Sequence, residues 1–251
     1  MGSAQVRIER DGEVWVVTGD YKLAADPTAS GFEPVKCHTL ITESTFGLPV
    51  YRWDTPAEIF ARVNAWWREN RAAGKTSVLF AYALGKAQRV MAGVDPSIGP
   101  ILTHGAVEKV TRAYRESGVP LPPTTPVSEL VVERGKPKPW AGALVLAPPS
   151  ADGSPWAKKF EPSSEAVASG WVQVRGTRRR MSVDRGFVLS DHADWPGLLT
   201  AVRDSGATRV LATHGFAGVL ARYLRDRGLD AGEIATRYGD EEAEAAGEAS
   251  P

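Results

Sequence analysis

The chain has 251 residues, of which 43% are hydrophobic and 24% are charged. This length can bury one large core or two modest ones, and the composition is that of an ordinary globular protein. No apolar run approaches the roughly 18 residues of a membrane span, and Met1 is followed by neither a basic patch nor an apolar stretch. We therefore expect no membrane span, no secretory signal and a cytoplasmic location, in agreement with a single cysteine that excludes an internal disulfide.

The formal net charge of zero conceals an uneven distribution of charge. Residues 240–251 contain five acidic side chains and no basic one, which leaves thirty basic and twenty-five acidic side chains in residues 1–239. We expect residues 240–251 to form an acidic disordered tail. The mildly basic remainder is compatible with a nucleic-acid partner but does not require one.

The N-terminal residues predict a β-hairpin. Residues 5–9 and 13–17 alternate between apolar and polar side chains on either side of Asp11-Gly12, a strong two-residue turn signal. The second strand ends close to Gly19-Asp20, and a Gly-Asp pair after a strand most often forms only a turn.

A buried strand follows over residues 39–42 and ends at Glu43. An acidic residue at this position can simply be exposed to solvent. The spacing of Cys37-His38 is not that of a metal motif, so we interpret both residues as packing residues or as neighbours of ligands.

Residues 48–177 predict a second α/β unit, inserted into the first. Asp54 or Thr55, with Pro56, caps a helix that runs to Arg71, and two strands, over residues 76–81 and 100–103, are each followed by a helix. The helix that begins near Lys86 is a candidate phosphate site, because helix N-termini and basic side chains both attract anions. An ordinary solvated first turn explains Lys86 equally well.

A basic cluster at Arg178, Arg179 and Arg180 precedes the last part of the chain. Such clusters are usually only solvated, but this one leads back towards a candidate active edge, so we hypothesise that the three arginines bind a nucleic-acid backbone.

Residues 186–218 predict a strand over 187–189, a helix over 195–204, a strand over 209–212 and a further helix. This order predicts two parallel strands of one sheet with the helix crossing between them. His192 follows the first strand and His214 the second. Because the carboxyl ends of parallel strands gather the chemistry of α/β sheets, we expect both histidines at one edge.

Five segments, in this order, resemble a known family: TGDYK, ITESTFG, LGKAQR, RRRMSVDRGFVLSDHADW and THG. Together they are similar to the metallo-β-lactamase-fold nucleases of the β-CASP group, and in particular to the bacterial DNA ligase-associated exonucleases, over about residues 2–238. The resemblance implies an α/β protein, namely a partial metallo-β-lactamase αββα sandwich with an inserted α/β β-CASP cap. The implied parts are residues 1–47 and 178–239 for the sandwich, 48–177 for the cap and 240–251 for the tail.

The same resemblance implies a zinc-dependent phosphodiesterase, a DNA exonuclease that works in DNA repair beside an ATP-dependent ligase and a helicase. It implies two zinc ions, with Asp20 and His214 as ligands. It also implies that His192 is a general acid oriented and polarised by Glu43.

The family pattern is incomplete in this chain, which contains no His-x-His motif and lacks the further family histidine. Only Asp20 and His214 of the expected ligands remain, so we expect weak metal binding and an impaired nuclease, and we interpret the sequence as starting inside a longer family sequence.

Three alternatives remain open at this point: a non-catalytic remnant that binds nucleic acid or a partner, an RNA-processing nuclease of the same superfamily, and a serine hydrolase using Ser190 and His192. The serine hydrolase is disfavoured because the chain has no Gly-x-Ser-x-Gly motif. The sequence predicts no oligomeric state.

Overall fold

The computed structural model describes residues 3–174 and 183–234. Its contacts divide the chain into two units, and each unit has its own sheet. The five-stranded unit contains residues 3–24, Gly31–Trp53 and residues 190–234. The six-stranded unit contains Ala25–Ser30 and the described part of Asp54–Leu189. The chain therefore passes between the units more than once.

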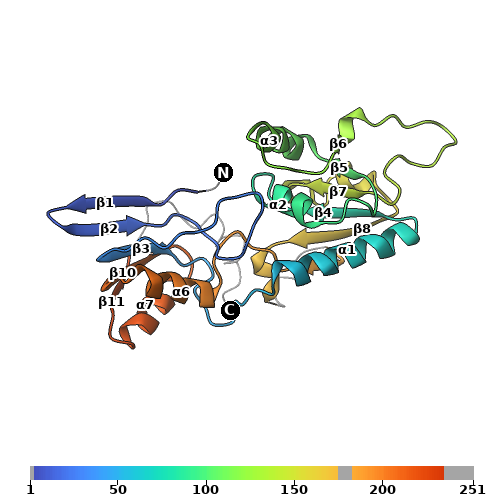
Figure 1. The fold of residues 1–251 in the computed structure, drawn as a ribbon. Helices are drawn as coiled ribbons and strands as arrows, with labels where there is room; N and C mark the ends of the chain where they lie inside the picture. The colour runs from blue at the N-terminus through green and yellow to red at the C-terminus, as the bar shows by residue number, and fades with distance from the viewer. Residues whose placement is uncertain (1–2, 175–182, 235–251) are drawn as a thin grey trace. The chain divides into compact units, whose positions relative to one another are not determined.

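The sheet of the five-stranded unit has the strand order β1-β2-β3-β10-β11 (Figure 1). Its strands are β1 (Val6–Arg10), β2 (Glu13–Val17), β3 (Thr39–Glu43), β10 (Arg209–Thr213) and β11 (Asp230–Glu233). Only β1 runs antiparallel to its neighbour, and the other four strands are parallel. Helices α6 (Trp195–Ser205) and α7 (Ala217–Arg225) belong to the same unit.

The predicted hairpin is present as β1 and β2, paired from Val6 with Val17 to Arg10 with Glu13. Asp11 and Gly12 both have positive φ, 51° and 83°, as the tight two-residue turn requires. Asp and Gly tolerate this backbone region better than most residues, which is why the local sequence was sufficient to predict the turn.

The core of the five-stranded unit lies between one face of its sheet and the two helices. Val16, Leu40 and Val210 pack there with Leu198 of α6 and Leu220 of α7. On β2 and β10 buried and partly exposed side chains alternate, as expected for strands with one fully covered face.

The six-stranded unit has the strand order β6-β5-β7-β4-β8-β9, and all of its strand pairs are parallel. The strands are β4 (Thr76–Phe80), β5 (Ile101–Thr103), β6 (Thr125–Pro126), β7 (Leu144–Ala147), β8 (Ser163–Ala168) and β9 (Arg185–Phe187). The helices are α1 (Pro56–Ala72), α2 (Lys86–Gly93), α3 (Gly105–Glu116), α4 (Pro155–Lys158) and the short 3-10 helices Val127–Glu129, Pro149–Ala151 and Gly170–Gln173. The α/β class predicted from the sequence is confirmed by both units.

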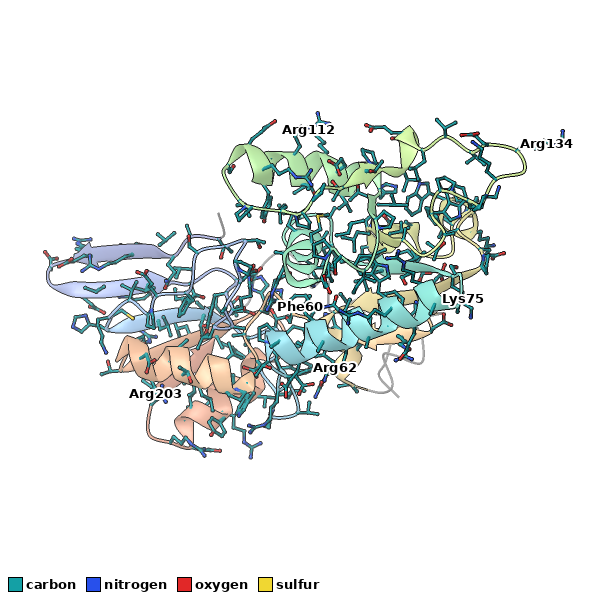
Figure 2. The ribbon with its side chains drawn as sticks, turned by 45° about the vertical axis from the view of Figure 1, so that its right-hand side comes forward. Phe60, Arg62, Lys75, Arg112, Arg134 and Arg203 are labelled. Carbon is teal, nitrogen blue, oxygen red and sulfur yellow. The ribbon has the colours of Figure 1, made fainter. Side chains whose placement is uncertain are left out.

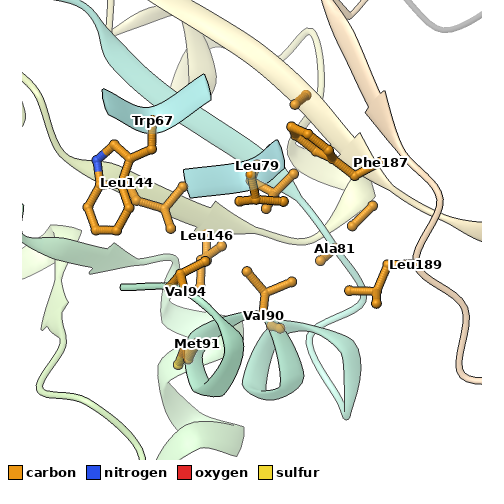
Figure 3. Close-up of a cluster of buried hydrophobic side chains, with 14 of the residues drawn as sticks. Trp67, Leu79, Ala81, Val90, Met91, Val94, Leu144, Leu146, Phe187 and Leu189 are labelled. Atoms are coloured by element: carbon orange, nitrogen blue, oxygen red, sulfur yellow. The ribbon is translucent and has the colours of Figure 1, made fainter. Parts of the chain in front are cut away.

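Two hydrophobic clusters involve alternating side chains of β4. Leu79 packs with Trp67 of α1 and Val90 of α2 (Figure 3). Val78 and Phe80 belong to the other cluster, which contains Phe160. A parallel strand buried on both faces reads as a continuous apolar run, which explains why residues 76–81 were predicted as a strand without any alternation.

One predicted sheet assignment is wrong. The strand expected over residues 187–189 forms as β9 at Arg185–Phe187, and it belongs to the sheet of the six-stranded unit, next to β8, and not to the sheet that contains β10. Phe187 packs against Trp66 of α1 with ring centroids 5.6 Å apart. The segment between β9 and α6 is long enough for the chain to change units after Leu189, and a βαβ pattern alone cannot reveal this change.

The units divide the chain after Trp53 and after Leu189, whereas the predicted parts divide it after residues 47 and 177. The predicted tail at residues 240–251 lies outside the described residues. No helix among the described residues is sufficiently long and apolar to cross a membrane.

Candidate functional site

Three neighbouring parallel strands of the five-stranded unit end at one edge of its sheet. Thr213 of β10 pairs with Glu43 of β3, and the Thr18 backbone N–H, just after β2, donates to the Ile41 carbonyl at 3.0 Å. Asp20 and His214 therefore lie beyond the carboxyl ends of β2 and β10, and Glu43 is the last residue of β3. Carboxyl ends of parallel strands are where open α/β sheets hold their functional side chains.

Glu43 is the centre of this edge. Its side chain is only 2% exposed. Its Oε1 accepts a hydrogen bond from the Tyr21 backbone N–H at 3.1 Å, and its Oε2 lies 2.9 Å from His192 Nδ1. Because a carboxylate only accepts, Nδ1 of His192 carries the proton of this contact. Both oxygens of the buried carboxylate thus have hydrogen-bond partners, as expected for a buried polar group.

His192 is held through its main chain as well as through its ring. Its backbone N–H donates to Ser190 Oγ at 3.1 Å, and its carbonyl accepts from Trp53 Nε1 at 3.1 Å. The side chain is 16% exposed, and its ring lies edge-on to Phe46 with centroids 5.9 Å apart. The imidazole is therefore close to solvent but has a fixed orientation.

Asp20 lies beside this pair. Its Oδ1 is 3.9 Å from His192 Nδ1, and its side chain is 66% exposed. Asp20, Glu43 and His192 each offer one possible ligand atom, and these three atoms lie within 4.8 Å of one another. The structure thus brings together three residues that the sequence predicted for one site.

His214 is at the same sheet edge, one residue beyond the pairing of Thr213 with Glu43, but it contributes no atom to that group of three. Its φ is 61°, and its side chain is exposed, with Nδ1 3.2 Å from Thr213 Oγ1. Ser44 fixes the turn, since its Oγ donates to the Thr213 and His214 carbonyls at 3.0 and 2.5 Å. Asp20 and His214 thus flank the end of β3 on its two neighbouring strands.

The donors present do not complete a zinc site. Zinc in proteins takes three or four protein ligands. Among the described residues of this edge, both oxygens of Glu43 are engaged with Tyr21 and His192, and Nδ1 of His192 is engaged with Glu43. Nε2 of His192 is a further possible donor, because a metal-binding histidine commonly donates its other ring N–H to a carboxylate. Asp20, His214 and this nitrogen are then the candidate ligands, fewer than the two zinc ions implied by the resemblance require.

Residues that sequence reasoning did not assign also surround the site. Tyr21 donates its backbone N–H to Glu43, and burial raises the pKa of its phenol, which lies 3.1 Å from Thr42 Oγ1. Lys22 pairs with Asp191 at 3.8 Å. Lys22 and Asp191 lie within the TGDYK and SDHADW segments. Their closeness in sequence to Asp20 and His192 could have indicated that they belong to the site.

The predicted phosphate-binding residues are not among the residues described at this edge. Lys86 in the six-stranded unit is only 4% exposed, with Nζ 4.6 Å from the centroid of the Tyr82 ring. This burial gives no support to a phosphate contact, and the role stays a prediction. Arg178, Arg179 and Arg180 lie outside the described residues. Exposed arginines of the described part include Arg112 on α3 and Arg134 in the loop before β7 (Figure 2).

The six-stranded unit has an open cavity of about 630 Å³ beside α1 and β9. Trp66 and Phe187 form its apolar part. Two ion pairs line it, Arg62 with Asp54 at 2.7 Å and Arg185 with Glu69 at 3.4 Å (Figure 2 labels Arg62). These pairs are largely exposed, so they contribute little to stability.

No family model matches the chain. It is 33% identical over 235 residues to a protein of Opitutus terrae named "Probable DNA ligase". That match covers 93% of this chain but 22% of the relative, so the chain spans about a fifth of the length of the curated relative it matches.

A solved structure, a protein of unknown function from Enterococcus faecalis, is similar to this chain with a TM-score of 0.58. The similarity covers 94% of this chain and 59% of that protein, at 11% sequence identity. At this identity the similarity concerns the fold alone. The comparisons therefore show a chain with a fold found in another protein and with a relative that carries the name of a DNA ligase.

Proposed function

We propose that this chain forms part of a metal-dependent phosphodiesterase that acts on DNA, with Glu43 and His192 as its proton-donating pair. The observation that carries the proposal is the 2.9 Å contact between Glu43 Oε2 and His192 Nδ1, at the edge that also holds Asp20 and His214. A buried carboxylate that accepts from Nδ1 fixes the tautomer and favours the protonated imidazole.

The proposed mechanism uses these residues for proton transfer. Cleavage of a phosphodiester releases an oxygen that must be protonated. Histidine is suited to this task, because its side chain can both hold and release a proton near neutral pH. Glu43 holds Nδ1, so the proton delivered to the leaving oxygen comes from Nε2. Lys22, which follows Asp20 by two residues and is paired with Asp191, is the cation proposed to attract the phosphate.

The metal enters the proposal through Asp20 and His214. A bound zinc ion in such an enzyme polarises the phosphate and activates water. Because the described residues present too few donors, we propose that further ligands come from polypeptide other than the residues of this chain. On this proposal the five-stranded unit belongs to a metallo-β-lactamase-type domain, and the six-stranded unit is a β-CASP-type cap.

The choice of DNA, of exonuclease activity and of a role in repair beside a ligase rests on two supports. One is the resemblance of the TGDYK, ITESTFG and SDHADW segments, and the other is the relative named as a probable DNA ligase. Binding through Arg178, Arg179 and Arg180, and through Lys86, is part of the same proposal.

The test compares this chain with a version extended by the coding sequence that precedes Met1 in its gene. End-labelled single-stranded and duplex DNA and an RNA of the same sequence are incubated with each protein and with zinc or manganese. We expect the extended protein to degrade DNA, and this chain alone to do so weakly or not at all. His192→Gln and Glu43→Gln in the extended protein should each lower the rate about 100-fold or more, the usual range for lost acid catalysis.

Glu69→Gln is a suitable control, because Glu69 is exposed on α1 and pairs only loosely with Arg185. It should leave the cleavage rate unchanged. The proposal is wrong if the extended protein carries the added metal motif and still cleaves no nucleic acid. Preferential cleavage of RNA would replace the DNA assignment by an RNA-processing nuclease.

A second candidate is a non-catalytic protein that binds nucleic acid or a partner, and the shortage of metal ligands favours it. Its signature would be single-stranded DNA binding that persists in a chelator, without cleavage by either protein.

A further inference from the structure

Trp53 makes two hydrogen bonds to the segment that carries His192. Its indole Nε1 donates to the His192 carbonyl at 3.1 Å, and its backbone N–H donates to Asp194 Oδ2 at 3.0 Å. Its ring also packs edge-on against Phe46, with centroids 4.9 Å apart. All four residues belong to the five-stranded unit.

Asp194 extends this contact into α6. Its Oδ1 accepts from the Gly197 backbone N–H at 2.9 Å and caps the helix, while Oδ2 accepts from Trp53. One carboxylate thus joins Trp53 to the start of a regular helix. Since His192 lies two residues before Asp194, its main chain is held between Trp53 and the capped end of α6.

The segment from Ser190 to Asp194 has no regular secondary structure that would fix its position. The chain leaves the five-stranded unit after Trp53 and returns at Ser190, and 139 residues separate Trp53 from His192. Local sequence therefore cannot align the returning segment with Glu43. Contacts between residues before Trp53 or at Trp53 and residues after Ser190 must align it.

We propose that Trp53 is a positioning residue for His192, and that its indole N–H sets the main chain at the place where Nδ1 meets Glu43. This inference rests on the proposed role of the Glu43–His192 pair. Both hydrogen bonds of Trp53 go to the segment that carries His192, so its action passes through the backbone of that residue.

The alternative is that Trp53 only fills space beside Phe46. The substitution Trp53→Phe separates the two, because it keeps an aromatic ring and removes the N–H donor. Trp15→Phe is the matched control: its indole also makes one hydrogen bond in this unit, to Glu13 at 3.0 Å. The readout is the proton on His192 Nδ1, observed by nitrogen-edited NMR of this chain and assigned with His192→Gln.

We expect the Nδ1 proton of Trp53→Phe to move upfield and to exchange with water about five- to tenfold faster, the factor that one lost hydrogen bond corresponds to. Trp15→Phe should leave both properties unchanged. An unchanged His192 signal in folded Trp53→Phe would overturn the proposal. If Trp53→Phe does not fold, the same His192 signal is measured in Asp194→Asn. Asparagine is still a good helix cap, but its amide N–H then faces one of the two donors, the backbone N–H of Trp53 or of Gly197.

This measurement needs neither metal nor DNA, so its result is independent of whether the chain takes part in a nuclease. A negative cleavage assay with a shifted His192 proton would leave the positioning role in place. In the extended protein, Trp53→Phe should lower the cleavage rate with little change in the substrate concentration for half-maximal rate, as expected for a misplaced acid.

Discussion

The carboxylate of Glu43 lies 2.9 Å from Nδ1 of His192, although 149 residues separate the two in the chain. The first residue ends strand β3, and the second lies in the segment that returns to the five-stranded unit before α6. The contact is thus a product of the tertiary fold, and it can be probed through both stability and chemistry.

We expect Glu43→Gln to reduce the free energy of unfolding by about 1–3 kcal/mol, the range for a buried polar group left unsatisfied. Glutamine can accept from only one of the Tyr21 N–H and the His192 Nδ1–H, and its amide nitrogen then faces the other donor. Urea denaturation followed by circular dichroism measures the change. The same substitution at Glu116, which is exposed on α3, should change stability by less than about 0.5 kcal/mol. Equal effects at both positions would contradict the burial argument.

Gly215 follows His214 and should not tolerate alanine. A Cβ there would lie 2.5 Å from Thr45 Cα and 2.7 Å from the Ser44 carbonyl oxygen, and φ is 59°. Gly228→Ala is the matched variant, because its φ is also positive, 86°, with no atom within 4 Å of the added Cβ.

We expect Gly228→Ala to lose about 1–2 kcal/mol from the left-handed backbone alone, and Gly215→Ala to lose about 1–3 kcal/mol more from the collision with backbone. Thermal and urea unfolding of the two variants compare these losses. Similar stabilities would show that the turn after β10 can relax, contrary to the close approach of Ser44 and Thr45.

Burial lowers the pKa of His104, and the nearby Lys159 ammonium lowers it further. His104 accepts from the Ala106 N–H through Nδ1 at 3.1 Å, and its ring lies 4.7 Å from that of Trp156. The folded protein therefore takes up a proton at His104 less readily than the unfolded chain does. The contribution of His104 to stability is fully present above the ordinary histidine pKa of about 6.5, and it is lost as the pH falls from there through the lower pKa of the folded state.

An NMR titration of His104 should show its pKa rising in Lys159→Met, because a like charge is removed. Lys158→Met is the control, since Lys159 and not Lys158 stands over the Trp156 ring, at 4.9 Å. A pKa that moves equally in both variants would assign the shift to something other than Lys159.

Zinc should add little to the stability of this chain. An ion that binds only the folded state stabilises it, and the gain grows with the logarithm of the ratio of ion concentration to Kd. About 50 µM zinc would therefore reveal a site of micromolar Kd as a rise in Tm. We expect no such rise, because Glu43 Oε2 and His192 Nδ1 are held by each other and His214 contributes no atom to the group formed by Asp20, Glu43 and His192. A clear rise that disappears in both Asp20→Asn and His214→Ala would show that these two residues hold the ion after all.

The sequence alone determined much of the local structure. The Asp11-Gly12 turn, the Pro56 helix start and the buried strand at Thr76–Phe80 depend on backbone preferences and on apolar patterns within a few residues, which the chain carries wherever it folds. The segments around Asp20, Glu43, His192 and His214 were also predicted as candidate positions from sequence. The order of elements predicted His192 and His214 at one edge, whereas only the resemblance gave a reason for Asp20 and Glu43 to join them.

The tertiary structure decided which strands are neighbours. β9 was predicted in one sheet with β10 and lies instead in the six-stranded sheet, where Phe187 packs on Trp66; the local order of elements fits either sheet. It also decided how His192 is held, since Trp53 and Glu43 reach it from 139 and 149 residues away. Local patterns specify helices and strands through short-range sterics. Contacts between distant residues depend on which apolar surfaces are buried against each other, and this depends on the whole chain.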